Sequence, residues 1–301
     1  MLDPGLLRLL ALVEDTGSLA GAADLLGITP AGVTAQVARL ERTIGAPVIR
    51  RGPRGASLEP LGRALLADAR AIEQAVASAE RAVDEFSGRA ARRLRVGAFT
   101  TAAFRLVAPA LTALRNRHDD LDLEVVEILS IDGPRLVRDD ELDIAVVSVF
   151  DETLVVDAAL TVEPIHVDPL VVVLPENHRL AGRSTRRSPM SLTALADEAW
   201  VAILAGADAR AQFDRLAREA GITPDIRFET TSYEVAQALV GAGIAVALVA
   251  ELAVRGVDGT VTRRVEGDRA HRTIEAIVRR ERTLTPLVDE FVALTRDVAR
   301  D

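Results

Sequence analysis

Arginine side chains are concentrated near the start of the chain, where they could neutralise the phosphates of a nucleic acid. Between residues 39 and 54, Glu41 is the single acidic residue. Phosphate neutralisation by basic side chains supplies most of the free energy of DNA binding. We therefore predict that this segment contacts a DNA backbone. The arginines concerned are Arg39, Arg42, Arg50, Arg51 and Arg54.

Two helices joined by a tight turn are predicted over residues 18–45, around the first of these arginines. Ser18 can cap the first helix, which ends at Gly27. Thr29 can cap the second helix, which ends at Gly45. This helix-turn-helix pattern predicts a second helix in the major groove, with its N-terminal residues at the base edges. The candidate DNA contacts there are small and mostly uncharged: Ser18, Thr29, Pro30, Ala31, Thr34 and Ala35.

The segment after these helices has the composition of a wing, the short hairpin that contacts phosphate or the minor groove. Residues 47–58, PVIRRGPRGASL, combine an apolar strand, a Gly/Pro turn and basic residues at the tip. The alternative is an ordinary pair of antiparallel helices followed by a solvated charge run, since helix-turn-helix patterns alone give false positives. The adjacent wing favours DNA binding.

Length and charge limit the class of protein. The chain has 301 residues, enough for two or three domains, and a formal net charge of -9. The acidic residues lie mainly downstream of the basic segment, as expected if only one small domain contacts DNA. We expect a cytoplasmic protein, because we find no export signal and no apolar run long enough to span a membrane.

A long helix is predicted from Pro60 to about Phe86, because apolar residues recur three and four positions apart. Such a seam favours pairing with a second helix, and we interpret it as a dimerisation helix. The alternative is a single helix that lies on its own domain. The seam consists of Leu61, Leu65, Ala69, Ile72, Val76, Ala79, Val83 and Phe86.

From residue 94 onward, strands and helices alternate, which predicts two α/β lobes. Strands are expected at 94–99, 123–129, 142–149, 166–175, 199–204, 225–230, 244–250 and 271–280. Helices are expected at 100–118, 133–141, 190–198, 208–221, 232–243 and 285–300. The last strand and helix could return to the first lobe. The expected domains are a winged helix-turn-helix at 1–59, a linker helix at 60–88 and a two-lobed region at 92–301, with lobe I about 92–162 and 266–301 and lobe II about 163–265.

In this order of features the chain resembles a LysR-type transcriptional regulator along essentially its whole length. The resemblance implies a winged helix-turn-helix, all-α apart from its wing, followed by two Rossmann-like lobes of the periplasmic-binding-protein type. It also implies self-association as a dimer or tetramer, a small-molecule effector between the lobes, no enzymatic activity, and RNA polymerase as a further partner. The segments that carry it are GSLAGAADLLGITPAGVTAQVARLERTIGAPVIRR, LEPLG, LVVVLPENHRLAG, LADEAWVAI, AREAGITPDIRFET and ALVGAGIAVAL.

The chain departs from the family pattern at several positions. Many members have Ser-Gln-Pro where this chain has Thr29-Pro30-Ala31, so base recognition must differ here. Leu19 and Ile49 stand where aromatic residues are usual, and both preserve burial. Glu59 stands where threonine commonly caps the linker helix.

Candidate effector contacts follow the predicted strands, because ligands of open α/β sheets bind beyond the carboxyl ends of the strands. For any one hydroxyl, the alternative is that it only caps its own helix. Helix N-termini favour anions, so the expected effector is anionic, a small organic acid or an amino acid. The candidates are Thr100, Thr101, Ser130, Ser148, Thr230 and Ser232, with Thr231 beside the last two.

Two other classes of protein compete with this interpretation. An enzyme would need a nucleophile with a base or paired carboxylates, and no such set is evident. A solute-binding protein would account for the lobes but not for residues 1–88. No metal or cofactor is expected, because the chain has no cysteine and its four histidines are isolated at His118, His166, His178 and His271.

Overall fold

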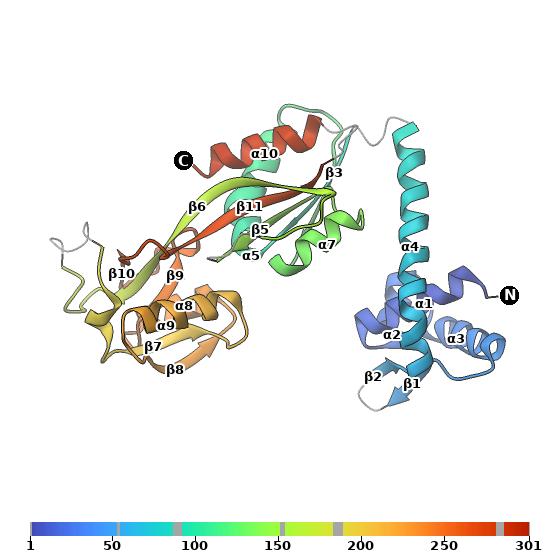
Figure 1. Ribbon diagram of the computed structural model, residues 1–301, viewed down its shortest axis with the longest axis horizontal. Coiled ribbons are helices and arrows are strands. Elements are labelled where there is room, and N and C mark those ends of the chain that lie inside the picture. The colour runs from blue at the N-terminus through green and yellow to red at the C-terminus, as the bar shows by residue number, and fades with distance from the viewer. Residues whose placement is uncertain are drawn as a thin grey trace. The chain divides into compact units, whose positions relative to one another are not determined.

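The computed structural model describes residues 2–52, 55–86, 92–150, 154–182, 189–280 and 286–300. The chain forms two units, Met1–Ala90 and Ala91–Asp301 (Figure 1). No helix of the described ranges is both long and apolar enough to cross a membrane.

The first unit contains the predicted pair of helices, and both begin and end where their sequence signals stand. The Ser18 hydroxyl accepts a hydrogen bond from the Gly21 N–H at 2.9 Å, and the Thr29 hydroxyl accepts one from the Gly32 N–H at 3.1 Å. Gly27 and Gly45 adopt left-handed backbone conformations that end the helices. The elements of the unit are α1 (Pro4–Thr16), α2 (Leu19–Leu26), α3 (Pro30–Ile44), β1 (Ile49–Gly52), β2 (Gly55–Leu58) and α4 (Pro60–Phe86).

The predicted wing is an antiparallel hairpin, in which Ile49 of β1 pairs with Leu58 of β2. The Glu41 carboxylate of α3 fixes its start, because it accepts hydrogen bonds from the N–H groups of Val48 and Ile49 at 3.0 and 3.3 Å. One face of α3 is buried through Val33, Val37 and Leu40, which are at most 1% exposed. The opposite face of α3 remains on the surface.

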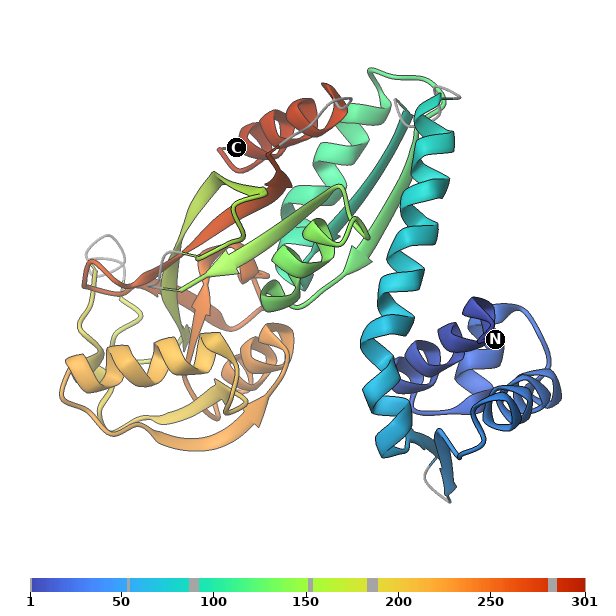
Figure 2. The same cartoon turned by 45° about the vertical axis from the view of Figure 1, so that its right-hand side comes forward.

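Helix α4 divides its apolar seam between two environments. Ala69 is fully buried and Ile72 is half-buried, both against the core of the first unit. Val76 and Val83 are 53% and 59% exposed. Both views show the later part of α4 extending beyond α1, α2 and α3 (Figure 2). The alternative interpretation, a helix lying on its own domain, is therefore correct for the first half of α4 only. The side chain of Phe86 lies outside the described residues.

Lobe I of the second unit is a sheet covered by helices on both faces, with strands in the order β6-β11-β5-β3-β4. Side chains of a strand alternate between the faces. Ile144 and Val146 of β5 pack with α6 and α10, whereas Ala145 and Val147 pack with α7. Its elements are β3 (Arg93–Ala98), α5 (Thr100–Ala102), a π-helical stretch (Ala103–Val107), α6 (Ala108–Arg115), β4 (Asp122–Glu127), α7 (Gly133–Arg138), β5 (Ile144–Val149), the first part of β6 (Leu160–Pro175), β11 (His271–Arg279) and α10 (Pro286–Val298).

Lobe II repeats this arrangement around the second part of β6. Leu170 and Val172 share a core with α8, whereas Val171 and Val173 share a core with α9. Strand β6 thus runs through both lobes, pairing with β11 up to Pro169 and with β9 from Leu170 (Figure 1). Further elements of lobe II are β7 (Ala199–Ile203), α8 (Asp208–Glu219), β8 (Asp225–Thr230), α9 (Tyr233–Gly241), β9 (Ala247–Ala250) and β10 (Thr260–Arg264).

The expected two-lobed α/β fold is confirmed, with corrections to individual elements. Strand β6 begins at Leu160 rather than residue 166, because it continues through a β-bulge next to Pro164 that hides the alternating pattern. Strand β10 was not predicted. The helix expected at 190–198 is reduced to a 3₁₀ turn at Leu192–Leu195. Helix α7 ends at Arg138, because Asp140 adopts a positive φ of 67°.

Candidate nucleic-acid interface and interlobe cavity

The candidate base contacts lie on the N-terminal part of α3 and the turn before it. Thr29, Pro30, Ala31 and Ala35 are exposed, and Thr34 is half-buried. Ser18 is half-buried at the start of α2, where its hydroxyl is occupied as a helix cap. The exposed side chains of the N-terminal part of α3 are therefore small and uncharged, whereas Arg39 and Arg42 are exposed farther along the same helix.

Two of the arginines predicted to contact phosphates are paired with carboxylates of the protein, which the sequence of residues 39–54 did not suggest. The Arg39 guanidinium lies 3.4 Å from the Asp3 carboxylate, and that of Arg50 lies 3.8 Å from that of Glu59. Both acids stand outside residues 39–54. These pairs are solvent-exposed and worth less than about 1 kcal/mol, so phosphates can replace the carboxylates. Arg51 is exposed, and Arg54 lies outside the described residues.

A cavity of about 830 Å³ lies between lobe I and lobe II. We call it the interlobe cavity. The predicted effector contact Thr230 does not line this cavity. Its hydroxyl instead accepts a hydrogen bond from the Ser232 N–H at 3.1 Å. Its neighbour Thr231 lines the cavity instead. The wall residues are 99–101, 127–131, 148, 150, 203, 206–209, 231–234 and 272, which include the candidates Thr100, Thr101, Ser130, Ser148 and Ser232.

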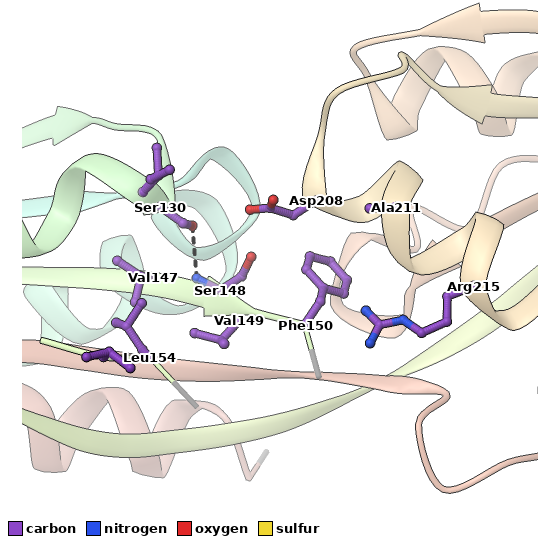
Figure 3. A pocket seen from close by; sticks show the side chains of 11 residues that line it. Ser130, Val147, Ser148, Val149, Phe150, Leu154, Asp208, Ala211 and Arg215 are labelled. Carbon is purple, nitrogen blue, oxygen red and sulfur yellow. Dashed lines mark hydrogen bonds between the residues drawn. The ribbon is translucent and has the colours of Figure 1, made fainter. Parts of the chain in front are cut away.

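Three hydroxyl groups of the wall already have partners within the protein. The Thr100 hydroxyl donates to the Glu127 carboxylate. The Ser130 hydroxyl accepts from the Ser148 N–H at 2.9 Å, as the dashed line in Figure 3 shows. The Ser232 hydroxyl accepts from the Glu234 N–H at 3.2 Å and caps α9. The Ser232 hydroxyl thus caps its own helix, whereas the hydroxyls of Thr100 and Ser130 join different elements.

A buried ion pair that sequence analysis missed lies beside the cavity. Asp168 of β6 is fully buried and Arg272 of β11 is 3% exposed. The Arg272 Nε donates to the Asp168 Oδ2 at 2.9 Å, and the Leu252 N–H donates to Oδ1 at 3.0 Å. The Arg272 guanidinium also stacks over the Phe99 ring at 4.9 Å. Asp168 therefore joins three segments of the second unit.

A second group of polar contacts joins the lobes at α9. The Arg255 guanidinium pairs with the Glu234 carboxylate at 2.7 Å and lies 3.9 Å from the centre of the Phe104 ring. Hydrogen bonds to its carboxylate lower the pKa of Glu234 to about 2; the bond from the Ser232 hydroxyl has the largest effect, and the bond from Arg255 the next largest. Arg105, in the π-helical stretch of lobe I, donates to the Leu252 carbonyl at 3.0 Å.

The described residues contain no group of three histidine, aspartate or glutamate side chains that could hold a metal ion. His118 and His178 instead contact Glu290 and Glu198, at 2.7 and 3.0 Å. Each of these two histidines therefore has a carboxylate partner.

Comparison with known proteins places both units in one family. Residues 4–63 match the model of bacterial regulatory helix-turn-helix proteins of the lysR family, and residues 87–300 match that of the LysR substrate binding domain. The chain belongs to the LysR family. It is 31% identical to the HTH-type transcriptional regulator CbbR of Xanthobacter flavus, over 93% of this chain and 83% of CbbR. It is also 31% identical to ShiR of Corynebacterium glutamicum (strain R), over 75% of each protein.

Solved structures of LysR-type regulators have the same fold. CbnR in complex with its target DNA matches with a TM-score of 0.67 and 21% identity, covering 99% of this chain and all of CbnR. This LysR-type protein is thus a transcriptional regulator with an effector-binding domain, and not an enzyme. The helix-turn-helix match likewise excludes a solute-binding transport component.

Proposed function

We propose that this LysR-type regulator binds double-stranded DNA through α3 and the β1–β2 wing, and that a small molecule in the interlobe cavity changes this binding. The observation that carries the proposal is the uncharged, exposed N-terminal part of α3, followed by exposed Arg39 in the same helix and exposed Arg50 and Arg51 in the wing. A crystal structure of the similar regulator CbnR contains its target DNA. In this proposal residues 1–59 bind DNA, 60–88 form the linker and 92–301 bind the effector.

The effector acts by shifting a population of conformations. A ligand changes an equilibrium only if it binds one arrangement more tightly than another. The interlobe cavity is suited to this, because its wall combines Thr101 and Ser130 of lobe I with Thr231 and Ser232 of lobe II. We place this activity in the cytoplasm, where the regulator meets its promoter and RNA polymerase.

The test is binding of a promoter fragment measured over a series of salt concentrations. We expect the logarithm of the affinity to fall linearly with the logarithm of the salt concentration, because phosphate contacts release counterions. A protein without affinity for any duplex in dilute buffer, with and without metabolites, would contradict DNA regulation.

Base and phosphate contacts are separable by mutation. Arg51→Ala is expected to weaken binding to all sequences and to reduce the salt slope by about one. Thr34→Ala is expected to cost about 1 kcal/mol on the cognate site only, if its hydroxyl meets a base edge. Fluorescence anisotropy with cognate and scrambled duplexes measures both. Equal losses on the two duplexes for Thr34→Ala would rule out base recognition by this residue.

We further propose that the exposed part of the α4 seam pairs two copies of the chain. Val76→Glu is expected to raise the dimer dissociation constant by about a hundredfold, since an unpaired carboxylate in an apolar interface costs about 3 kcal/mol. Ala67→Glu, on an exposed position of α4 outside the seam, is the matched control. Light scattering over a dilution series measures the mass. Ile72→Glu is unsuitable, because Ile72 also packs in its own unit.

A further inference from the structure

Acidic residues of the chain itself stand at or beside the helix N-termini around the interlobe cavity. Glu127 accepts the hydroxyl of Thr100, the first residue of the helical run from 100 to 115. Asp208 is the first residue of α8, and Glu234 is the second residue of α9. Carboxylates are stabilised at such positions. The expectation of an anionic effector was based on these helix N-termini, where the structure places acidic side chains.

The charged side chains on the wall leave an excess of negative charge. They are Glu127, Asp208, Glu234 and Arg272. Arg255 balances Glu234, and Asp168 balances Arg272. Among the described residues, Glu127 and Asp208 have no cationic partner.

These two carboxylates come from opposite sides of the interlobe cavity. Glu127 ends β4 in lobe I, whereas Asp208 begins α8 in lobe II. Figure 3 shows an adjoining pocket that shares Ser130, Ser148, Phe150 and Asp208 with the interlobe cavity; there Asp208 is directed toward Ser130 and Ser148, and Arg215 of α8 lines the part near Phe150. An acid entering this space would meet like charges, and a cation would relieve their repulsion.

We propose that the effector of this cavity carries a positively charged nitrogen group, an amine or a guanidinium, held between Glu127 and Asp208. The inference rests on the proposed function and names the chemical class of its ligand. A volume of about 830 Å³ fits an organic molecule rather than a bare ion. The ring of Phe150 on the wall is suited to an organic cation, whereas the Phe99 ring already carries the Arg272 guanidinium. Because one carboxylate belongs to each lobe, the bound cation favours the arrangement that brings the lobes together.

The test is thermal unfolding of the full chain with matched probes of opposite charge. The cationic probes are putrescine, agmatine and L-arginine, the anionic probes are succinate and glutarate, and butanediol is the neutral control. At a hundredfold excess over its dissociation constant, a cationic probe is expected to raise Tm by about 5 °C or more. The acids and butanediol are expected to leave Tm unchanged.

Isosteric variants connect the shift to the proposed site. Glu127→Gln and Asp208→Asn are each expected to reduce the affinity for the cationic probe at least about tenfold. Glu266→Gln, which changes an exposed glutamate outside the cavity wall, should keep the full shift. If Glu127→Gln fails to unfold cooperatively, the comparison rests on Asp208→Asn.

Three results overturn the inference: no cationic probe raises Tm, an acid raises it instead, or the shift survives in both cavity variants. Promoter binding by the wild-type protein is measured in the same buffer. If DNA binding is salt-dependent but any of these results is found, the inference of a cationic effector is wrong and the proposed function stands. Loss of DNA binding under every condition contradicts the proposed function.

Discussion

Asp168→Ala is expected to lower the free energy of unfolding of the second unit by about 3–5 kcal/mol, because it leaves Arg272 charged and buried without its counter-ion. Asp168 is fully buried, and its two oxygens accept from the Arg272 Nε and the Leu252 N–H. Alanine removes both acceptors and leaves a void between β6 and β11. The expected loss is a large share of the stability of a typical domain.

Urea unfolding followed by tryptophan fluorescence measures this effect. Trp200 is the only tryptophan of the chain and is fully buried in lobe II. Asp225→Ala is the matched control, because Asp225 pairs with Arg227 at 2.7 Å on the surface and its loss should cost less than about 1 kcal/mol.

A double variant separates the loss of the ion pair from the loss of packing. Asp168→Leu combined with Arg272→Met is expected to recover most of the stability, since apolar replacement of a buried pair is often neutral. If Asp168→Ala costs no more than Asp225→Ala, Arg272 is not held as a buried charge.

Local signals explain why the helix-turn-helix was predictable. Ser18 and Thr29 cap helices through N–H groups three residues away, and Gly27 and Gly45 end helices through their own backbone conformation. Each feature is determined within a few residues. The family match to residues 4–63 and the structure both agree with this part of the prediction.

Long-range pairing explains the errors in the second unit. Strand β10 is defined by its ladder with β6, from Thr260 opposite Pro175 to Arg264 opposite Val171. Its sequence alone does not show that pairing. The first part of β6 is likewise defined by β11, more than a hundred residues away, and its bulge breaks the period of two on which strand prediction depends.

In the candidate site, too, features set by nearby residues were predictable, and features set by residues distant in the sequence were not. Hydroxyls such as Thr100 and Ser130 were predictable, because they follow strands whose ends share one edge of the sheet. The charge of the cavity was not, since it depends on whether each carboxylate meets a guanidinium from elsewhere. Glu234 meets Arg255, whereas Asp208 has no such partner within the described residues.

Gly62→Ala is expected to destabilise the first unit by about 3 kcal/mol, although alanine is the better helix former by about 1 kcal/mol. Gly62 is the third residue of α4, and a Cβ there would lie 2.3 Å from the Val48 carbonyl oxygen. That oxygen is also fixed by the Glu59 N–H at 2.9 Å. The contact is with backbone, so α4 or the segment that leads into the wing must move.

Gly32→Ala is the matched control, because Gly32 is likewise the third residue of a helix that begins with proline. A Cβ at Gly32 meets its nearest atom, the Thr29 hydroxyl oxygen, at 3.4 Å, which is ordinary contact. Calorimetry of the full chain should show a lowered transition of the first unit for Gly62→Ala alone, with the Trp200 transition of the second unit unchanged. If Gly62→Ala melts like Gly32→Ala, the close approach of α4 to Val48 does not hold the wing. If it melts early and loses DNA affinity, packing at the start of α4 positions Arg50 and Arg51 for the phosphates.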